Sequence, residues 1–154
     1  MESSDLIPLK VSVIKVENKN EMEFQSMSKI QIYFDGGCKP NPGNMEICIV
    51  IVGDGAPQPK TVFDLGHGTN NIAEWSALLW AASTAKERGY KDVEFLGDNI
   101  TVINQADNKW KIKERSFLPF KEEFMRLNYE IGGKLTHTPR ATNRAGTYLE
   151  SGIV

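Results

Sequence analysis

Residues 30–43 read IQIYFDGGCKPNPG, and this stretch decides how the rest of the sequence is interpreted. Its apolar residues alternate with Gln31 and Tyr33 in the two-residue period of a β-strand. Asp35 follows, and the turn-forming residues after it predict that the strand ends there. An aspartate at this place either opens a turn or is a functional carboxylate. Acidic residues farther along the sequence favour the second alternative.

The composition is that of an ordinary soluble globular domain. Of the 154 residues, 40% are hydrophobic and 25% are charged, and no apolar run approaches the length of a transmembrane helix. The first residues lack the basic start and long apolar segment of a secretory signal, and two cysteines cannot form a disulfide framework. We therefore expect a cytoplasmic protein. Its net charge of −2 means that local contacts would have to hold any polyanionic partner.

We predict an N-terminal extension over residues 1–28 and one domain over residues 29–154. In the extension, residues 10–16 alternate like a strand, and Pro8 restricts such a strand to a sheet edge. A flexible tail followed by a linker fits the same residues equally well. The extension carries no recognisable chemistry under either interpretation.

Two further strands are predicted directly after the first. Residues 47–52 are almost all apolar and lead into the turn-forming residues 53–57. Residues 60–65 then predict a third strand, which ends ahead of the loop Gly66-His67-Gly68. Because both connections are short, the three strands should be antiparallel.

The longest helical pattern runs from Asn71 to Arg88, with Gly89 placed to end the helix. If Asn71 is the N-cap, Glu74 can close a capping box, which is a structural role. Glu74 also shares a helix face with apolar residues such as Leu78, so that its carboxylate would point toward the sheet. A buried acid needs a partner.

A second strand-end acid, Asp98, follows the predicted strand of residues 92–97 and precedes a helix over residues 99–106. Asp98 is either the N-cap of that helix or a site residue. Strand ends beside a helical crossover are where ligands collect in such sheets. If this strand lies parallel beside the first one, Asp35 and Asp98 emerge side by side, which divalent cations would make tolerable.

Four segments in this order resemble the type 1 ribonuclease H family: YFDGG at 33–37, NPG at 41–43, TNNIAE at 69–74 and LGDN at 96–99. The resemblance extends from about residue 29 to residue 150. It implies an α/β ribonuclease H-like fold, with a five-stranded mixed sheet of order 3-2-1-4-5 and helices on both faces. Residues 119–131 would then form a helix, residues 134–138 the fifth strand, and residues from 143 onward the terminal helix.

The resemblance implies metal ligands at Asp35, Glu74 and Asp98. The family chemistry would use two Mg²⁺ ions, with Mn²⁺ as a substitute, about 4 Å apart, to activate water and neutralise the leaving 3′ oxygen. Asp35 would bridge both ions. Glu74 would hold the ion nearest the substrate 2′-hydroxyl, and Asp98 would lie on the side of the attacking water.

The resemblance also assigns substrate contacts to small polar residues. Asn41 and Thr69 match positions that touch the nucleic-acid backbone, and Asn70 and Asn71 match positions in the minor groove of the hybrid. Such side chains suit recognition of groove shape and 2′-hydroxyls, although turn formation and helix capping are structural alternatives. His137 has the spacing of a mobile catalytic histidine that assists product release, or it is incidental.

Three departures from the family pattern bear on activity. Thr147 stands where the family carries a fourth acid, and Glu150 is either a surrogate for that acid or a solvated residue at the helix end. The glycine-rich stretch expected after NPG is replaced by residues 44–47, NMEI, which add the acid Glu46. The chain between Asp98 and residue 119 is too short for the basic protrusion of some members.

The function that these observations predict is endonucleolytic cleavage of the RNA strand of RNA/DNA hybrids, leaving 5′-phosphate and 3′-hydroxyl ends. The protein would act on hybrid as a monomer, without a membrane or an obligate protein partner. One alternative is a weak or inactive module that binds hybrid or another protein, which the missing fourth acid favours. A second alternative is an exonuclease of the wider superfamily.

Overall fold

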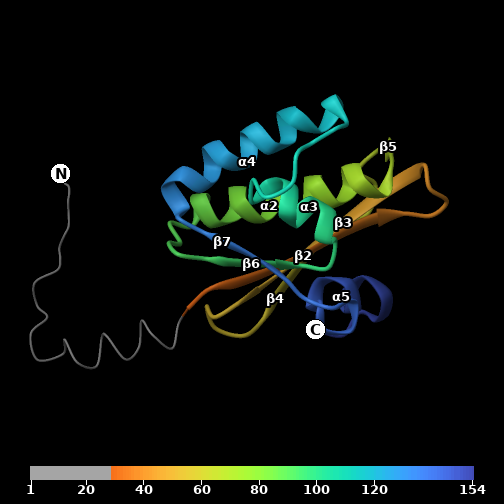
Figure 1. Ribbon diagram of the computed structural model, residues 1–154. Coiled ribbons are helices and arrows are strands. Elements are labelled where there is room, and N and C mark those ends of the chain that lie inside the picture. The colour runs from red at the N-terminus through yellow and green to blue at the C-terminus, as the bar shows by residue number, and fades with distance from the viewer. Residues whose placement is uncertain (1–28) are drawn as a thin grey trace, which may run out of the picture.

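The computed structural model describes residues 29–154, and the predicted extension over residues 1–28 lies outside the described residues. One sheet holds the strands in the order β4-β3-β2-β6-β7 (Figure 1). Their bounds are Gln31–Cys38 for β2, Gly43–Val52 for β3, Gln58–Val62 for β4, Glu94–Gly97 for β6 and Lys134–His137 for β7. Counted from β2, this is the predicted order 3-2-1-4-5.

The predicted strand directions are also confirmed. β2 pairs antiparallel with β3, and β3 pairs antiparallel with β4. β6 lies parallel to both β2 and β7, as the helical crossovers require. A two-residue strand, β5 (His67–Gly68), pairs with the start of β3, so that His67 is an exposed strand residue rather than part of the predicted loop.

Helices cover both faces of the sheet. They are α2 (Asn70–Glu87), α3 (Ile100–Ala106), α4 (Leu118–Ile131) and α5 (Arg144–Ser151), with short 3₁₀ turns η2 (Arg115–Phe117) and η3 (Arg140–Thr142). α2 packs across β2 with α4 resting on it, whereas α5 lies on the opposite side of the sheet (Figure 1). Among residues 29–154, no helix combines the length and apolar content needed to cross a membrane.

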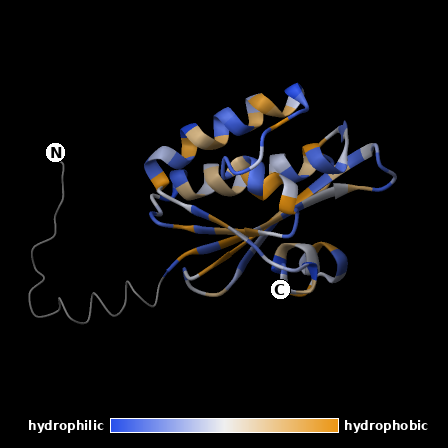
Figure 2. Cartoon of the chain, in the orientation of Figure 1, coloured by the Kyte–Doolittle hydropathy of each residue, from blue (hydrophilic) through white to orange (hydrophobic). Residues whose placement is uncertain are grey.

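Successive side chains of β3 point to opposite faces of the sheet and so contribute to two apolar layers. Ile49 and Ile51 point into the larger core beneath α2 and α4, and Cys48 and Val50 point into a smaller one beneath α5. This two-sided burial explains why β3 reads as an almost continuous apolar run. In Figure 2 the strands at the centre of the sheet are correspondingly hydrophobic, while α4 alternates between polar and apolar residues.

Two predicted boundaries near the acids are wrong. β2 does not end at Asp35 but continues through two glycines to Cys38, because Gly36 and Gly37 keep pairing with β3. The third strand spans Gln58–Val62 rather than residues 60–65, and Pro59 is tolerated because β4 is an edge strand.

The observed helix caps exclude the capping roles that the sequence left open for Glu74 and Asp98. Thr69, not Asn71, is the N-cap of α2, since its hydroxyl accepts the Ile72 N–H. Asn99, not Asp98, caps α3 by accepting the Val102 N–H. Glu74 therefore lies too far into its helix for a capping box, and neither Glu74 nor Asp98 has a capping role.

Candidate active site

Three carboxylates meet at the centre of the sheet. Asp35 comes from β2, Glu74 from the second turn of α2, and Asp98 from the residue after β6. One oxygen from each lies within 4.8 Å of the others. The parallel pairing of β2 with β6 brings the two aspartates together, and the buried face of α2 supplies the glutamate, as the sequence predicts.

The close packing of α2 on β2 depends on a residue without a side chain. A Cβ at Gly36 would lie 2.4 Å from the backbone oxygen of Ala73, which precedes Glu74. Any side chain at this position would push the helix away from the strand. Gly36 thus allows carboxylates from neighbouring elements to share one site.

Burial makes the charges of this cluster costly. Asp35 is 4% exposed and Glu74 is 6% exposed. Burial and the negative charge of Asp98 raise the pKa of Asp35 to about 6, despite the opposing effect of Arg140. Burial, followed by the charges of Asp35 and Asp98, raises the pKa of Glu74 well above its ordinary value. Such shifts are typical of functional sites, although ion-pair networks also cause them.

Two oxygens of the cluster are buried without a hydrogen bond. Oδ1 of Asp35 and Oε1 of Glu74 have no such partner anywhere in residues 29–154. Buried polar atoms are normally satisfied. An all-oxygen donor set of three carboxylates suits a hard divalent cation such as Mg²⁺ or Mn²⁺, so the residues present fit the metal that the sequence analysis expects.

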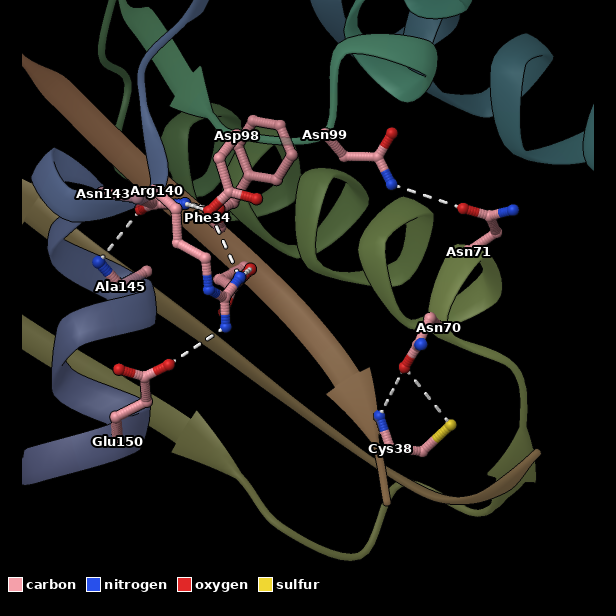
Figure 3. Close-up of polar contacts among 11 residues, drawn as sticks. Phe34, Cys38, Asn70, Asn71, Asp98, Asn99, Arg140, Asn143, Ala145 and Glu150 are labelled. Atoms are coloured by element: carbon pink, nitrogen blue, oxygen red, sulfur yellow. Dashed lines mark hydrogen bonds and ion pairs between the residues drawn. The ribbon is translucent and has the colours of Figure 1, made fainter. Parts of the chain in front are cut away.

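Asn143 ties the cluster to α5. This fully buried side chain donates from Nδ2 to the Phe34 carbonyl and to Oδ2 of Asp98, each over 3.0 Å. Its Oδ1 accepts the N–H of Ala145, which caps α5 (Figure 3). Asn143 thus fixes one oxygen of Asp98 while it anchors the last helix against β2.

A cleft of about 1000 Å³ opens from the cluster along one end of the sheet. Of the substrate residues predicted from sequence, three amides line it: Asn41, Asn70 and Asn71. Thr69 is only adjacent to the cleft and acts as the helix cap. Glu46 and Glu150 also line the cleft, so that the cleft contains two carboxylates in addition to those of the cluster.

His137 and Thr147 do not line this cleft. His137 is the exposed last residue of β7, paired with Gly97. Thr147 is exposed on α5, whereas the neighbouring Gly146 is the residue that approaches Asp35. A Cβ built on Gly146 would lie 3.3 Å from Oδ2 of Asp35, so α5 approaches the acid with its backbone.

Arg140, which no sequence motif singled out, reaches the cluster from η3. Its Nη1 lies 3.6 Å from Oδ2 of Asp98 and 4.0 Å from Oδ1 of Asp35, and its Nη2 donates to Glu150 over 3.1 Å (Figure 3). Its place in the sequence could have indicated this contact. Arg140 lies in the turn after the predicted fifth strand, and that strand is predicted to lie parallel beside the one that ends at Asp98, so both strand ends reach the same edge of the sheet.

Comparisons with known proteins agree with this geometry. Residues 34–149 match a family model described as reverse transcriptase-like. A curated protein of Halobacterium salinarum named ribonuclease HI is 32% identical over 79% of this chain, and the match spans 62% of that protein. The chain therefore covers less than two thirds of that relative.

Solved structures give the same result. The crystal structure of ribonuclease H1 from Halobacterium salinarum covers 79% of this chain and 93% of its own, with a TM-score of 0.69 and 30% identity. The structure of LC11 ribonuclease H1 in complex with RNA/DNA hybrid covers 77% of this chain and 92% of its own, with a TM-score of 0.70 and 29% identity.

Proposed function

This chain belongs to the ribonuclease H-like family matched by the reverse transcriptase-like model, and from that premise we propose that it hydrolyses the RNA strand of RNA/DNA hybrids. The observation that carries the proposal is the carboxylate cluster of Asp35, Glu74 and Asp98, in which two buried oxygens have no hydrogen bond among residues 29–154 and two of the acids line the cleft. Divalent cations, when bound there, supply the Lewis acidity that activates water and neutralises the leaving 3′ oxygen.

Each acid has a distinct position toward such cations. Asp35 comes from the central strand, which contacts the elements that carry the other two acids, so it would contribute ligand oxygens to both cations. Glu74 projects from α2, the helix whose first turn carries Asn70 and Asn71, and we assign it to the substrate side. Asn143 holds Asp98 by one oxygen, which leaves its other oxygen for the ion on the side of the attacking water.

The asparagines supply donors suited to a hybrid backbone. Oδ1 of Asn70 accepts the N–H of Cys38, and Oδ1 of Asn41 accepts the N–H of Asn70. Because each amide oxygen is used within the protein, the Nδ2 donors are left for phosphate and 2′-hydroxyl oxygens. This arrangement recognises backbone shape rather than base sequence, as hybrid binding requires.

The test is cleavage of an internally labelled RNA/DNA hybrid with Mg²⁺ or Mn²⁺, with EDTA as the metal-free control. We expect internal RNA fragments with 5′-phosphate ends and no cutting of a DNA duplex of the same sequence, since the 2′-hydroxyl identifies the strand. Release of mononucleotides from one end would instead identify an exonuclease. Equal cutting of the DNA duplex would contradict the proposal.

A second candidate is a module that binds hybrid without cutting it. Two observations favour it: exposed Thr147 replaces an acid, and Arg140 lies against the carboxylates. Hybrid binding by the wild-type protein, measured by fluorescence anisotropy, with no cleavage in either metal, would select this candidate. Cleavage that Asp35→Asn abolishes would exclude it.

A further inference from the structure

Arg140 is shared between the carboxylate cluster and Glu150. Its side chain is 62% exposed, yet one guanidinium nitrogen lies within 4.0 Å of both aspartates while another bonds to Glu150. Glu150 is itself 63% exposed and is not one of the three acids that form the cluster. The guanidinium thus has two sets of acidic partners, the aspartates of the cluster and the exposed Glu150, and Figure 3 shows it between Asp98 and Glu150.

The position of Arg140 conflicts with a bound cation. A divalent ion held by Asp35 and Asp98 would bond to their oxygens at about 2 Å. A guanidinium within 4.0 Å of oxygens in the same two carboxylates would repel that ion. Without a cation, the same guanidinium offsets the mutual repulsion of the acids. The positive charge of Arg140 therefore stabilises the cluster when no cation is bound and destabilises it when a cation is bound.

Glu150 offers the guanidinium a place away from the cluster. The Arg140 side chain is long and mostly exposed, so it can turn toward Glu150 without disturbing the core. We propose that Arg140 is an internal counter-ion that competes with divalent cations for the carboxylate cluster, and that Glu150 is a positioning residue that draws Arg140 away when a cation binds. The inference rests on the proposed metal-dependent function and adds a control of metal affinity to it.

The test measures Mn²⁺ binding to the free protein by isothermal titration calorimetry at pH 8, without substrate. For Arg140→Gln, we expect the dissociation constant to fall roughly two- to fivefold, the effect of removing one exposed competing charge. For Glu150→Gln, we expect the dissociation constant to rise by a similar factor, because the carboxylates of the cluster are then the only acidic partners left to Arg140. Arg140→Lys keeps the positive charge, so its dissociation constant for Mn²⁺ should lie closer to the wild-type value than that of Arg140→Gln.

The double variant is the decisive measurement. If Glu150 acts only through Arg140, the variant carrying both Arg140→Gln and Glu150→Gln binds Mn²⁺ like Arg140→Gln alone. If Glu150→Gln still weakens binding in the Arg140→Gln background, Glu150 is a direct ligand and the inference is wrong. An unchanged or raised dissociation constant for Arg140→Gln overturns it as well, as does a wild type that binds no Mn²⁺.

A matched pair on α4 controls for the change in net charge. Arg126 and Glu123 form an exposed ion pair of the same type on that helix, away from the cleft. Arg126→Gln and Glu123→Gln should leave Mn²⁺ binding unchanged, and thermal unfolding checks that every variant is folded. Wild-type cleavage of hybrid is assayed separately, so that a protein that binds Mn²⁺ as expected but does not cut hybrid contradicts the proposed function and not this inference.

Discussion

Asp35 is a buried carboxylate in the middle of a strand, between a cationic side chain and two other acids. Its pKa is raised to about 6, first by burial and then by the charge of Asp98. A carboxyl group whose folded-state pKa exceeds its unfolded value binds protons more tightly in the folded protein. Its stabilising contribution is complete at low pH and is lost as the pH rises from about 4 toward 7. Without a cation, ionising this group therefore works against folding.

The first prediction concerns Asp35→Asn, which keeps the shape of the side chain and removes its charge. In EDTA, the wild-type melting temperature should fall between pH 4 and pH 7, and Asp35→Asn should fall less and melt several degrees higher at pH 8. The same variant should not cleave hybrid. Circular dichroism melts across this pH range check the first part. A variant that melts lower than wild type at pH 8 would mean that the ionised Asp35 carboxylate stabilises the fold, which contradicts the prediction.

A second prediction concerns Thr147, which stands beside Gly146, the residue of α5 that approaches Asp35. An acid at position 147 would place a negative charge next to the backbone that approaches Asp35, and a nearby negative charge favours cation binding. Thr147→Asp should lower the Mg²⁺ concentration that gives half-maximal cleavage, by up to roughly fivefold for one added exposed charge. Thr147→Asn is the neutral control of the same shape. Equal Mg²⁺ dependence in both variants would contradict the prediction.

Between elements, the contact that matters most for the site is the one between β2 and α2. The third prediction is that Gly36→Ala costs about 2–4 kcal/mol of unfolding free energy, because its Cβ would meet rigid backbone. Gly37→Ala is the matched control on the same strand, where a Cβ would meet only the side chain of Asn70. Urea denaturation gives both values, and equal losses would contradict the prediction.

The order of elements could be predicted from the sequence because it follows from local patterns. The alternation in β2, the apolar run of β3 and the helical period of α2 each have a length and period of their own. Once the crossover is recognised, the parallel placement of β6 brings Asp35 and Asp98 together. Local patterns and one crossover are therefore enough to predict that these carboxylates share a site.

The errors arose where several residues compete for one role. Three residues at the start of helix α2 are all able to cap it, Thr69, Asn70 and Asn71. Asn70 Oδ1 instead accepts the N–H of Cys38, a tertiary hydrogen bond, and Thr69 caps the helix. Two glycines predicted the end of β2, but pairing with β3 and close packing of α2 keep them extended. Arg140 was missed because two of its three acidic partners, Asp35 and Asp98, lie far from it in the sequence.

Across the whole molecule, charge gives little help in attracting nucleic acid. The net charge is −2, and the cleft is lined by four carboxylates, those of Asp35, Glu46, Glu74 and Glu150. Lys39 and Arg140 are the basic residues among those that line it. Hybrid binding must therefore rely on local amide donors and on cations held by the acids, and it should weaken sharply when EDTA removes divalent ions.

The last prediction concerns the division of the chain. Residues 29–154 by themselves supply a carboxylate cluster, a cleft lining and two apolar cores. Deleting residues 1–27 should therefore leave the melting temperature within a few degrees of wild type and the rate of hybrid cleavage within about twofold. As the control, deleting residues 1–33 also removes the fully buried Ile32 and the paired start of β2, and it should prevent folding. A large fall in melting temperature for the shorter deletion would show that residues 10–16 belong to the sheet, since an added edge strand contributes backbone pairing that the domain would then lose.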